Sequence, residues 1–181
     1  MSGQEPKNKP HISYRVALGG IVAALCLMTM VMAGVFPILY IAAPMVAGVL
    51  LVILVQEVST GWAALTYAAT AVLSVFVVPD REATLMFVLF FGYYPLMRPK
   101  IKKLPTKLLR LLAKLGLYQL FLVADYLLTV YVLGLPTFDE FAPWVLPLLD
   151  LVATAVFVMY DSLLDGLTAF YHQVVRRRLR R

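Results

Sequence analysis

The sequence predicts an all-α integral membrane protein, a bundle of six transmembrane helices. Hydrophobic residues make up 62% of the 181 residues and charged residues only 14%, against about 25% charged in soluble domains. The apolar residues form long runs, close to the ~20 residues that a helix needs to cross a bilayer. Basic residues gather at the ends of these runs. Because burial is limited by surface-to-volume scaling, a soluble domain of this length would leave much of this apolar surface in water.

Six apolar runs are predicted to cross the membrane, and proline, glycine or polar residues end most of them. In chain order these predicted spans are Val16–Phe36, Ile38–Val55, Gly61–Val78, Ala83–Met97, Leu115–Leu135 and Phe141–Tyr160. The fourth is short and carries Pro95, and the helix of the sixth is predicted to continue to Arg176. None shows the alternation that a membrane β-barrel needs. We expect one transmembrane domain, 16–171, between a cytoplasmic segment 1–15 and a basic cytoplasmic tail 172–181.

A basic segment, Arg98–Lys114, separates the fourth and fifth predicted spans. Its lysines and arginines are interleaved with leucines, and Thr106 is a candidate N-cap. This pattern predicts a basic amphipathic helix that lies at the membrane surface and leads into the fifth span.

The distribution of basic residues predicts the orientation. If the amino terminus is cytoplasmic, fifteen of the sixteen lysines and arginines fall in cytoplasmic segments, and only Arg81 lies outside. The positive-inside rule therefore favours a multi-pass protein of the cell membrane with both termini in the cytoplasm. The net charge of +6 is then explained by topology and by contact with membrane lipid, and no nucleic-acid partner is expected.

Two carboxylates lie near the middle of the last two predicted spans, Asp125 and Asp150. A carboxylate at this depth costs ~2.5–3.5 kcal/mol and usually faces a bundle interior, a cavity or a partner. Helical spacing places Tyr118 and Thr129 on the face of Asp125, and Thr154 on the face of Asp150. These five residues are the candidate solute-binding residues. A structural alternative, an interhelical hydrogen bond with one or both carboxyls protonated, stays open.

Three further acidic residues have structural interpretations. Asp161 and Asp165 continue the stripe of Asp150 toward the cytoplasmic end, where we expect them to be hydrated or paired with the tail arginines. Glu57 ends the second span and is expected to form an ion pair with a cation of the basic segment.

Sequence motifs disfavour an enzyme. The chain has no Walker-type phosphate loop and no serine in a nucleophile-elbow pattern, and His11 and His172 stand at opposite ends of the chain. The single cysteine, Cys26, allows neither an intramolecular disulfide nor a cysteine metal cluster. We expect no catalytic residue, cofactor or metal.

The first predicted span carries two small-xxx-small pairs, Gly19 with Ala23 and Gly20 with Ala24, which allow close helix approach. Together with six short spans in this length and the segment Phe91–Lys100, this architecture resembles the substrate-binding S component of energy-coupling factor (ECF) transporters, or an uncharacterised bacterial membrane family related to it. The resemblance implies a membrane coupling subunit facing Gly20 and Ala24 (or Gly19 and Ala23), and two cytoplasmic ATPases. It also implies a substrate near the outer face, under the loops between spans one and two, three and four, and five and six.

The leading hypothesis is therefore a membrane transport component that binds a small solute among its helices and has no ATPase of its own. If Asp125 and Asp150 are ionised, a cationic solute is favoured. The alternative is a scaffold like the rod-shape-determining membrane proteins, which would bind protein partners. A lipid-modifying enzyme is a third, less favoured possibility, because the sequence lacks the metal-binding acidic cluster that such enzymes use.

Overall fold

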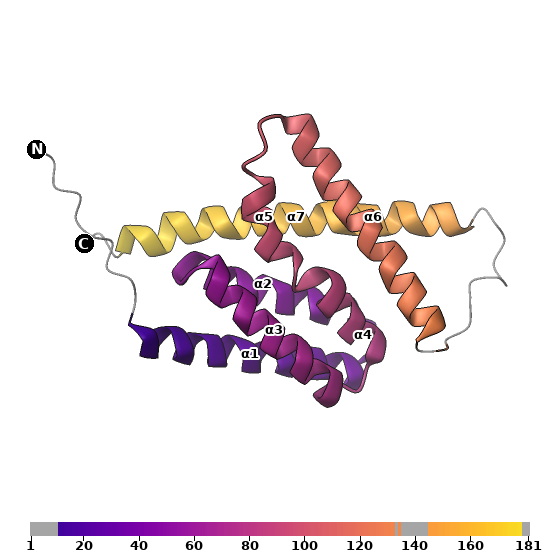
Figure 1. The fold of residues 1–181 in the computed structure, drawn as a ribbon, viewed down its shortest axis with the longest axis horizontal. Helices are drawn as coiled ribbons and strands as arrows, with labels where there is room; N and C mark the ends of the chain where they lie inside the picture. Colours follow the sequence, from indigo (N-terminus) through magenta and orange to yellow (C-terminus); the bar gives the residue numbers. More distant parts are fainter. Residues whose placement is uncertain (1–10, 133, 135–144, 179–181) are drawn as a thin grey trace, which may run out of the picture.

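The computed structural model describes residues 11–132, 134 and 145–178, and these residues form helices and their connections without any strand. The predicted all-α class is therefore confirmed. The α-helices are α1 (Ile12–Val35), α2 (Ala42–Glu57), α3 (Thr60–Val77), α4 (Arg81–Met86), α5 (Tyr94–Ile101), α6 (Lys107–Tyr131) and α7 (Val145–Arg178). A 3₁₀ turn, η1 (Pro37–Leu39), precedes α2, and a π-helical turn, η2 (Phe87–Phe91), follows α4. Figure 1 shows α1 and α7 running antiparallel, with α6 crossing α7 at an angle.

Four helices in the described part of the chain are long and apolar enough to cross a membrane: α1, α3, α6 and the 147–171 portion of α7. They indicate a membrane-embedded protein, and they coincide with the first, third, fifth and sixth predicted spans. Helix α7 runs through to Arg178, as the predicted continuation of the sixth span requires. Its predicted start, at residue 141, lies outside the described residues. The second predicted span corresponds to the shorter helix α2, of 16 residues.

The fourth predicted span, Ala83–Met97, is not one helix. It is divided into α4, the π-turn η2 and α5. The break falls at Gly92. The backbone there lies so close to Tyr67 of α3 that a Cβ would be 2.7 Å from the Tyr67 ring. The Tyr67 hydroxyl also donates to the Val88 carbonyl, and Pro95 stands in the first turn of α5, where its missing N–H costs nothing. This interruption is the main reason why the helix lengths do not confirm six spans.

The predicted surface helix between spans four and five is not confirmed either. Its residues are divided between the last turns of α5, a connection at 102–106 and the first turns of α6. Thr106 caps α6 as predicted, its hydroxyl accepting from the Leu109 N–H at 3.3 Å. Helix α6 then continues without interruption into its apolar part, so the basic residues belong to a helical hairpin.

The first three helices form an apolar core of their own. Cys26, Ala47, Leu51, Leu54 and Ala63 are fully buried where α1, α2 and α3 meet. The Cys26 thiol donates to the Ala47 carbonyl at 3.3 Å. The small side chains of Cys26, Ala47 and Ala63 bring the helix backbones close together.

A second core is aromatic, and it joins η2 and α5 to α6 and α7. The rings of Tyr118 and Phe157 stack with centroids 4.9 Å apart, and Phe90 meets both edge-on. Helix α2 connects this core to the first one at Gly48. A Cβ on Gly48 would lie 2.2 Å from the Phe91 carbonyl oxygen and 2.5 Å from the Tyr160 hydroxyl, so only glycine allows this approach.

Candidate functional site

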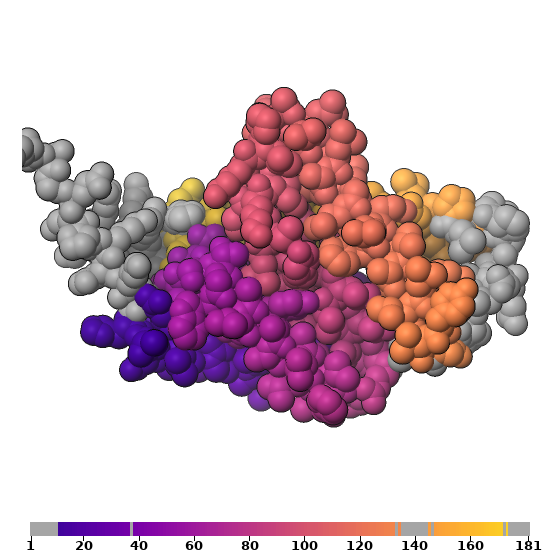
Figure 2. All heavy atoms as spheres, viewed as in Figure 1, coloured from indigo at the N-terminus to yellow at the C-terminus, as the bar shows by residue number. Residues whose placement is uncertain are grey.

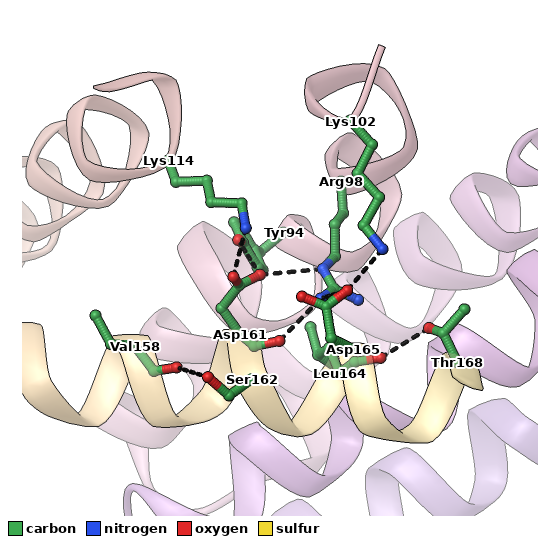
Figure 3. A network of polar contacts seen from close by, with 10 residues as sticks. All are labelled: Tyr94, Arg98, Lys102, Lys114, Val158, Asp161, Ser162, Leu164, Asp165 and Thr168. Atoms are coloured by element: carbon green, nitrogen blue, oxygen red, sulfur yellow. Dashed lines mark hydrogen bonds and ion pairs between the residues drawn. The ribbon is translucent and has the colours of Figure 1, made fainter. Parts of the chain in front are cut away.

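The most densely built polar feature is an ion-pair cluster where α5, α6 and α7 meet. We use this name for Tyr94 and Arg98 of α5, Lys102 just beyond it, Lys114 of α6, and Asp161 and Asp165 of α7 (Figure 3). Tyr94 and Arg98 lie one helical turn apart and therefore face α7 together. Asp161 and Asp165 repeat the same spacing on α7, so two short stripes meet side by side.

Asp161 is the centre of the cluster. Its Oδ1 accepts from the Tyr94 hydroxyl at 2.7 Å and from Arg98 Nε at 3.0 Å. Its Oδ2 accepts from the ammonium group of Lys114. Both carboxylate oxygens are thus occupied, one by α5 and the other by α6. A single side chain of α7 therefore holds two neighbouring helices.

Arg98 extends the network along α7. Its Nη2 donates to the Asp161 backbone carbonyl at 2.8 Å and lies 2.7 Å from Asp165 Oδ1. Lys102 also reaches Asp165 Oδ1, at 2.7 Å. The cluster therefore holds three cations against two carboxylates.

Exposure differs between the two ends of this network. The side chains of Arg98, Asp161 and Lys114 are 6%, 15% and 18% exposed, whereas those of Lys102 and Asp165 are 44% and 51% exposed. A buried charge must be paired and hydrogen-bonded, and removing one partner leaves the other uncompensated. Since both oxygens of the inner carboxylate already accept from protein donors, the arrangement is suited to holding helices together.

Asp161 and Asp165 pair with Arg98, Lys102 and Lys114 of the basic segment, which were not the expected partners. The expected hydration fits Asp165, which is 51% exposed, and does not fit Asp161, which is 15% exposed. The side chains of the tail arginines lie outside the described residues. A signal for this pairing was present: the basic segment and the end of the sixth span were predicted to share one side of the membrane. The expected ion pair of Glu57 with the basic segment is not found among the described residues either, since the Glu57 carboxylate accepts from the Tyr171 hydroxyl.

The two mid-span aspartates lie in separate environments. One carboxylate oxygen of Asp125 is buried without a hydrogen-bond partner in the described part of the chain, and its charged neighbour is Glu82 of α4. Asp150 instead accepts from the Gln119 amide at 3.4 Å. No hydrogen bond or ion pair joins the two aspartates within the described residues.

The other three predicted solute-binding residues, Tyr118, Thr129 and Thr154, do not all lie at one place. Tyr118 is buried in the aromatic core, with Thr154 and Asp150 of α7 in its surroundings, and its hydroxyl is buried without a hydrogen-bond partner among the described residues. Thr129 is half-buried two residues before the end of α6. The structure thus brings Tyr118, Thr154 and Asp150 together at the α6–α7 crossing, and it leaves Asp125 facing α4.

A hollow of about 380 Å³ lies at the end of α1. It is lined by Ala33, Gly34, Tyr40, Pro79, Asp80 and Glu82. Asp80 caps α4 by accepting from the Ala83 N–H at 3.0 Å. The neighbouring cation, Arg81, donates to the Val75 carbonyl at 2.6 Å and forms no ion pair with these acids among the described residues. The hollow is therefore acidic, and the charge of Glu82 also acts on Asp125 of α6.

The small residues of α1 face two directions. A Cβ on Gly19 would lie 3.0 Å from the Thr66 hydroxyl of α3, whereas a Cβ on Gly20 would meet nothing within 4 Å. Ala23 is half-buried and Ala24 is exposed. The Gly19–Ala23 pair therefore serves packing within the chain, and the Gly20–Ala24 pair is open to its surroundings.

Within the described residues, no group of three His, Cys, Asp or Glu side chains is placed to hold a metal ion. Comparison with known proteins identifies no relative, since no family, curated protein or solved structure matches this chain.

Proposed function

We propose that the chain is a multi-pass protein of the cell membrane that binds a small cationic solute as the membrane component of a transporter and relies on separate ATPases for energy. The observation that carries this proposal is the acidic hollow at the end of α1, together with the buried carboxylate oxygen of Asp125 that has no hydrogen-bond partner among the described residues and lies within electrostatic range of Glu82. An unpaired carboxylate at membrane depth is costly, and a cationic ligand would offset that cost.

The arrangement of the helix ends supports the placement of both termini on one side of the membrane. In Figure 1 the start of α1 and the end of α7 lie near one another, and the end of α6 and the start of α7 lie at the opposite end of the molecule. The hollow is at the end of α1 that lies farther from the end of α7. With both termini in the cytoplasm, it would open toward the outer face, where the ECF resemblance expects the substrate.

The exposed pair Gly20–Ala24 supports a partner helix on α1. Between the two alternatives, Gly19–Ala23 is already used by α3, so a coupling subunit would approach the Gly20–Ala24 side. Close approach of a second helix at such a pair needs no change in the chain itself.

The solute hypothesis is tested by binding measurements on the full chain in mild detergent. Thermal shift and equilibrium dialysis are run with a panel of small organic amines and with neutral and anionic compounds of matched size. We expect amines to bind, and we expect Glu82→Gln and Asp125→Asn to weaken that binding at least tenfold. Asp150→Asn tests the second aspartate separately. Asp165→Asn, in the ion-pair cluster, is the matched charge control and should bind normally. Binding by none of the three classes would refute the solute proposal.

The scaffold alternative is favoured by one observation, the small share of α6 that the chain buries. Only 6% of its candidate span is buried, against 28% for α1 and for α3. Affinity purification from mild detergent separates the two functions. Recovery of a coupling protein with an ATPase pair supports transport, and its loss in Gly20→Leu would locate the contact. Recovery of cell-wall or cytoskeletal proteins supports a scaffold.

A further inference from the structure

The seven cations of the basic segment are sorted into two sets. Arg98, Lys102 and Lys114 form the ion pairs with α7. The other four form no ion pair among the described residues, and they are Lys100, Lys103, Lys107 and Arg110. No Asp or Glu occurs between residues 83 and 124, so nearby sequence cannot neutralise this second set. Three of the four are exposed, and Arg110 is partly buried.

The unpaired cations stand beside exposed leucines. They lie in residues 100–112, which we call the basic tip, where α5 ends and α6 begins. Leu108, Leu109, Leu111 and Leu112 of this tip are 67%, 45%, 51% and 57% exposed. Figure 2 shows the connection between α5 and α6 projecting from the body of the molecule. The tip therefore presents positive charge and apolar surface together, away from the helical core.

The cluster fixes the position of this tip. Arg98 and Lys102 attach the end of α5 to α7, and Lys114 attaches α6. Arg110 closes the tip from within, since its Nε donates to the Leu104 carbonyl at 3.0 Å. The unpaired lysines are thus carried on a hairpin whose two sides are both held to the same helix.

We propose that the basic tip binds the phosphate headgroups of anionic phospholipids, with its leucines inserted at the level of the upper acyl chains. The length of helix α6 indicates that the ligand of the basic tip is a lipid bilayer. Its 25 residues give a length of about 37 Å at the usual rise, several ångströms more than the ~30 Å hydrocarbon core. Its first turns therefore lie at the headgroups when the rest of the helix crosses the membrane. Lysines with neighbouring leucines at this depth suit an anionic surface.

A triple variant tests this proposal in the full chain. We compare the wild type with Lys100→Gln/Lys103→Gln/Lys107→Gln, which keeps Arg110 and its internal hydrogen bond. The control Arg177→Gln/Arg178→Gln/Arg180→Gln removes the same charge from the carboxyl-terminal tail. Native mass spectrometry in detergent measures the retention of phosphatidylglycerol relative to phosphatidylcholine. Since each lysine near an anionic surface contributes on the order of a fivefold preference, the tip variant should lower the ratio at least fivefold and the tail variant should not.

Four outcomes would overturn the proposal. The first is an unchanged lipid ratio in the tip variant, and the second is an equal loss in the tail variant, which would mean that total charge alone decides. The third is full competition by millimolar inorganic phosphate, which would indicate a site for free phosphate. Thermal unfolding in nanodiscs of either lipid provides the second readout: phosphatidylglycerol should raise the melting temperature of the wild type, and this gain should disappear in the tip variant. The proposal would also be refuted if an acidic protein, and not lipid, were purified with the chain in a fixed ratio and bound at the basic tip.

Discussion

Helices α1–α3 are packed through small and apolar side chains, whereas α6 and α7 are attached through aromatic rings and ion pairs. In the candidate spans of α1 and α3, 28% of residues are buried, against 17% in α7 and 6% in α6. Lipid tails are as apolar as leucine, so apolar burial alone does not drive helices together in a membrane. The comparison teaches that two solutions coexist in one chain: close backbone approach in the first region, and specific polar contacts in the second.

The largest effect is expected from Asp161→Asn, which removes the shared anion of the cluster. Arg98 and Lys114 are left without their buried counter-charge, so we expect the free energy of unfolding to fall by about 3–5 kcal/mol. Denaturant titration in detergent measures it. Protease cleavage between α5 and α6 should rise while α1–α3 stays protected. A loss spread equally over both regions would contradict the division between them.

Gly48→Ala should have the next largest effect, because α2 is where the two regions meet. The added methyl would lie 2.2 Å from the Phe91 carbonyl oxygen and 2.5 Å from the Tyr160 hydroxyl. Overpacking of this kind typically costs 1–3 kcal/mol. The matched control is Gly20→Ala, where a Cβ meets nothing within 4 Å and stability should be unchanged or slightly raised. Equal melting temperatures for the two variants would refute the close approach.

The smallest effect is expected from Lys102→Gln, at the exposed end of the cluster. Its partner, Asp165, is 51% exposed and keeps Arg98, and exposed ion pairs contribute about 0–1 kcal/mol. Melting temperatures at low and high salt should differ less in this variant than in the wild type, because screening acts on exposed charges. A loss as large as that of Asp161→Asn would mean that the outer pair also holds the helices.

The sequence predicts the long spans well and the contacts between them poorly. The runs that became α1, α3, α6 and α7 are recognisable because length and hydropathy are local properties. The break in the fourth run is not local: it depends on Gly92 lying against Tyr67, a residue from another helix. In the same way, the sequence shows both the basic segment and Asp161, but the spacing of residues along one helix does not reveal which residues of another helix they contact. The influence of the Glu82 charge on Asp125, a residue of another helix, depends on tertiary structure in the same way.

The length of α7 means that a change of helix tilt at the ion-pair cluster would displace the distant end of this helix. At the usual rise, its 34 residues form a rod of about 51 Å, well beyond the ~30 Å of hydrocarbon. The ion-pair cluster contacts this helix near its middle, at Asp161, and seventeen residues follow before the helix ends at Arg178. A tilt of about 10° around that grip would move the end of the helix by roughly 4 Å. A small displacement of α5 and α6 at the cluster would therefore produce a larger displacement at the carboxyl-terminal end of α7.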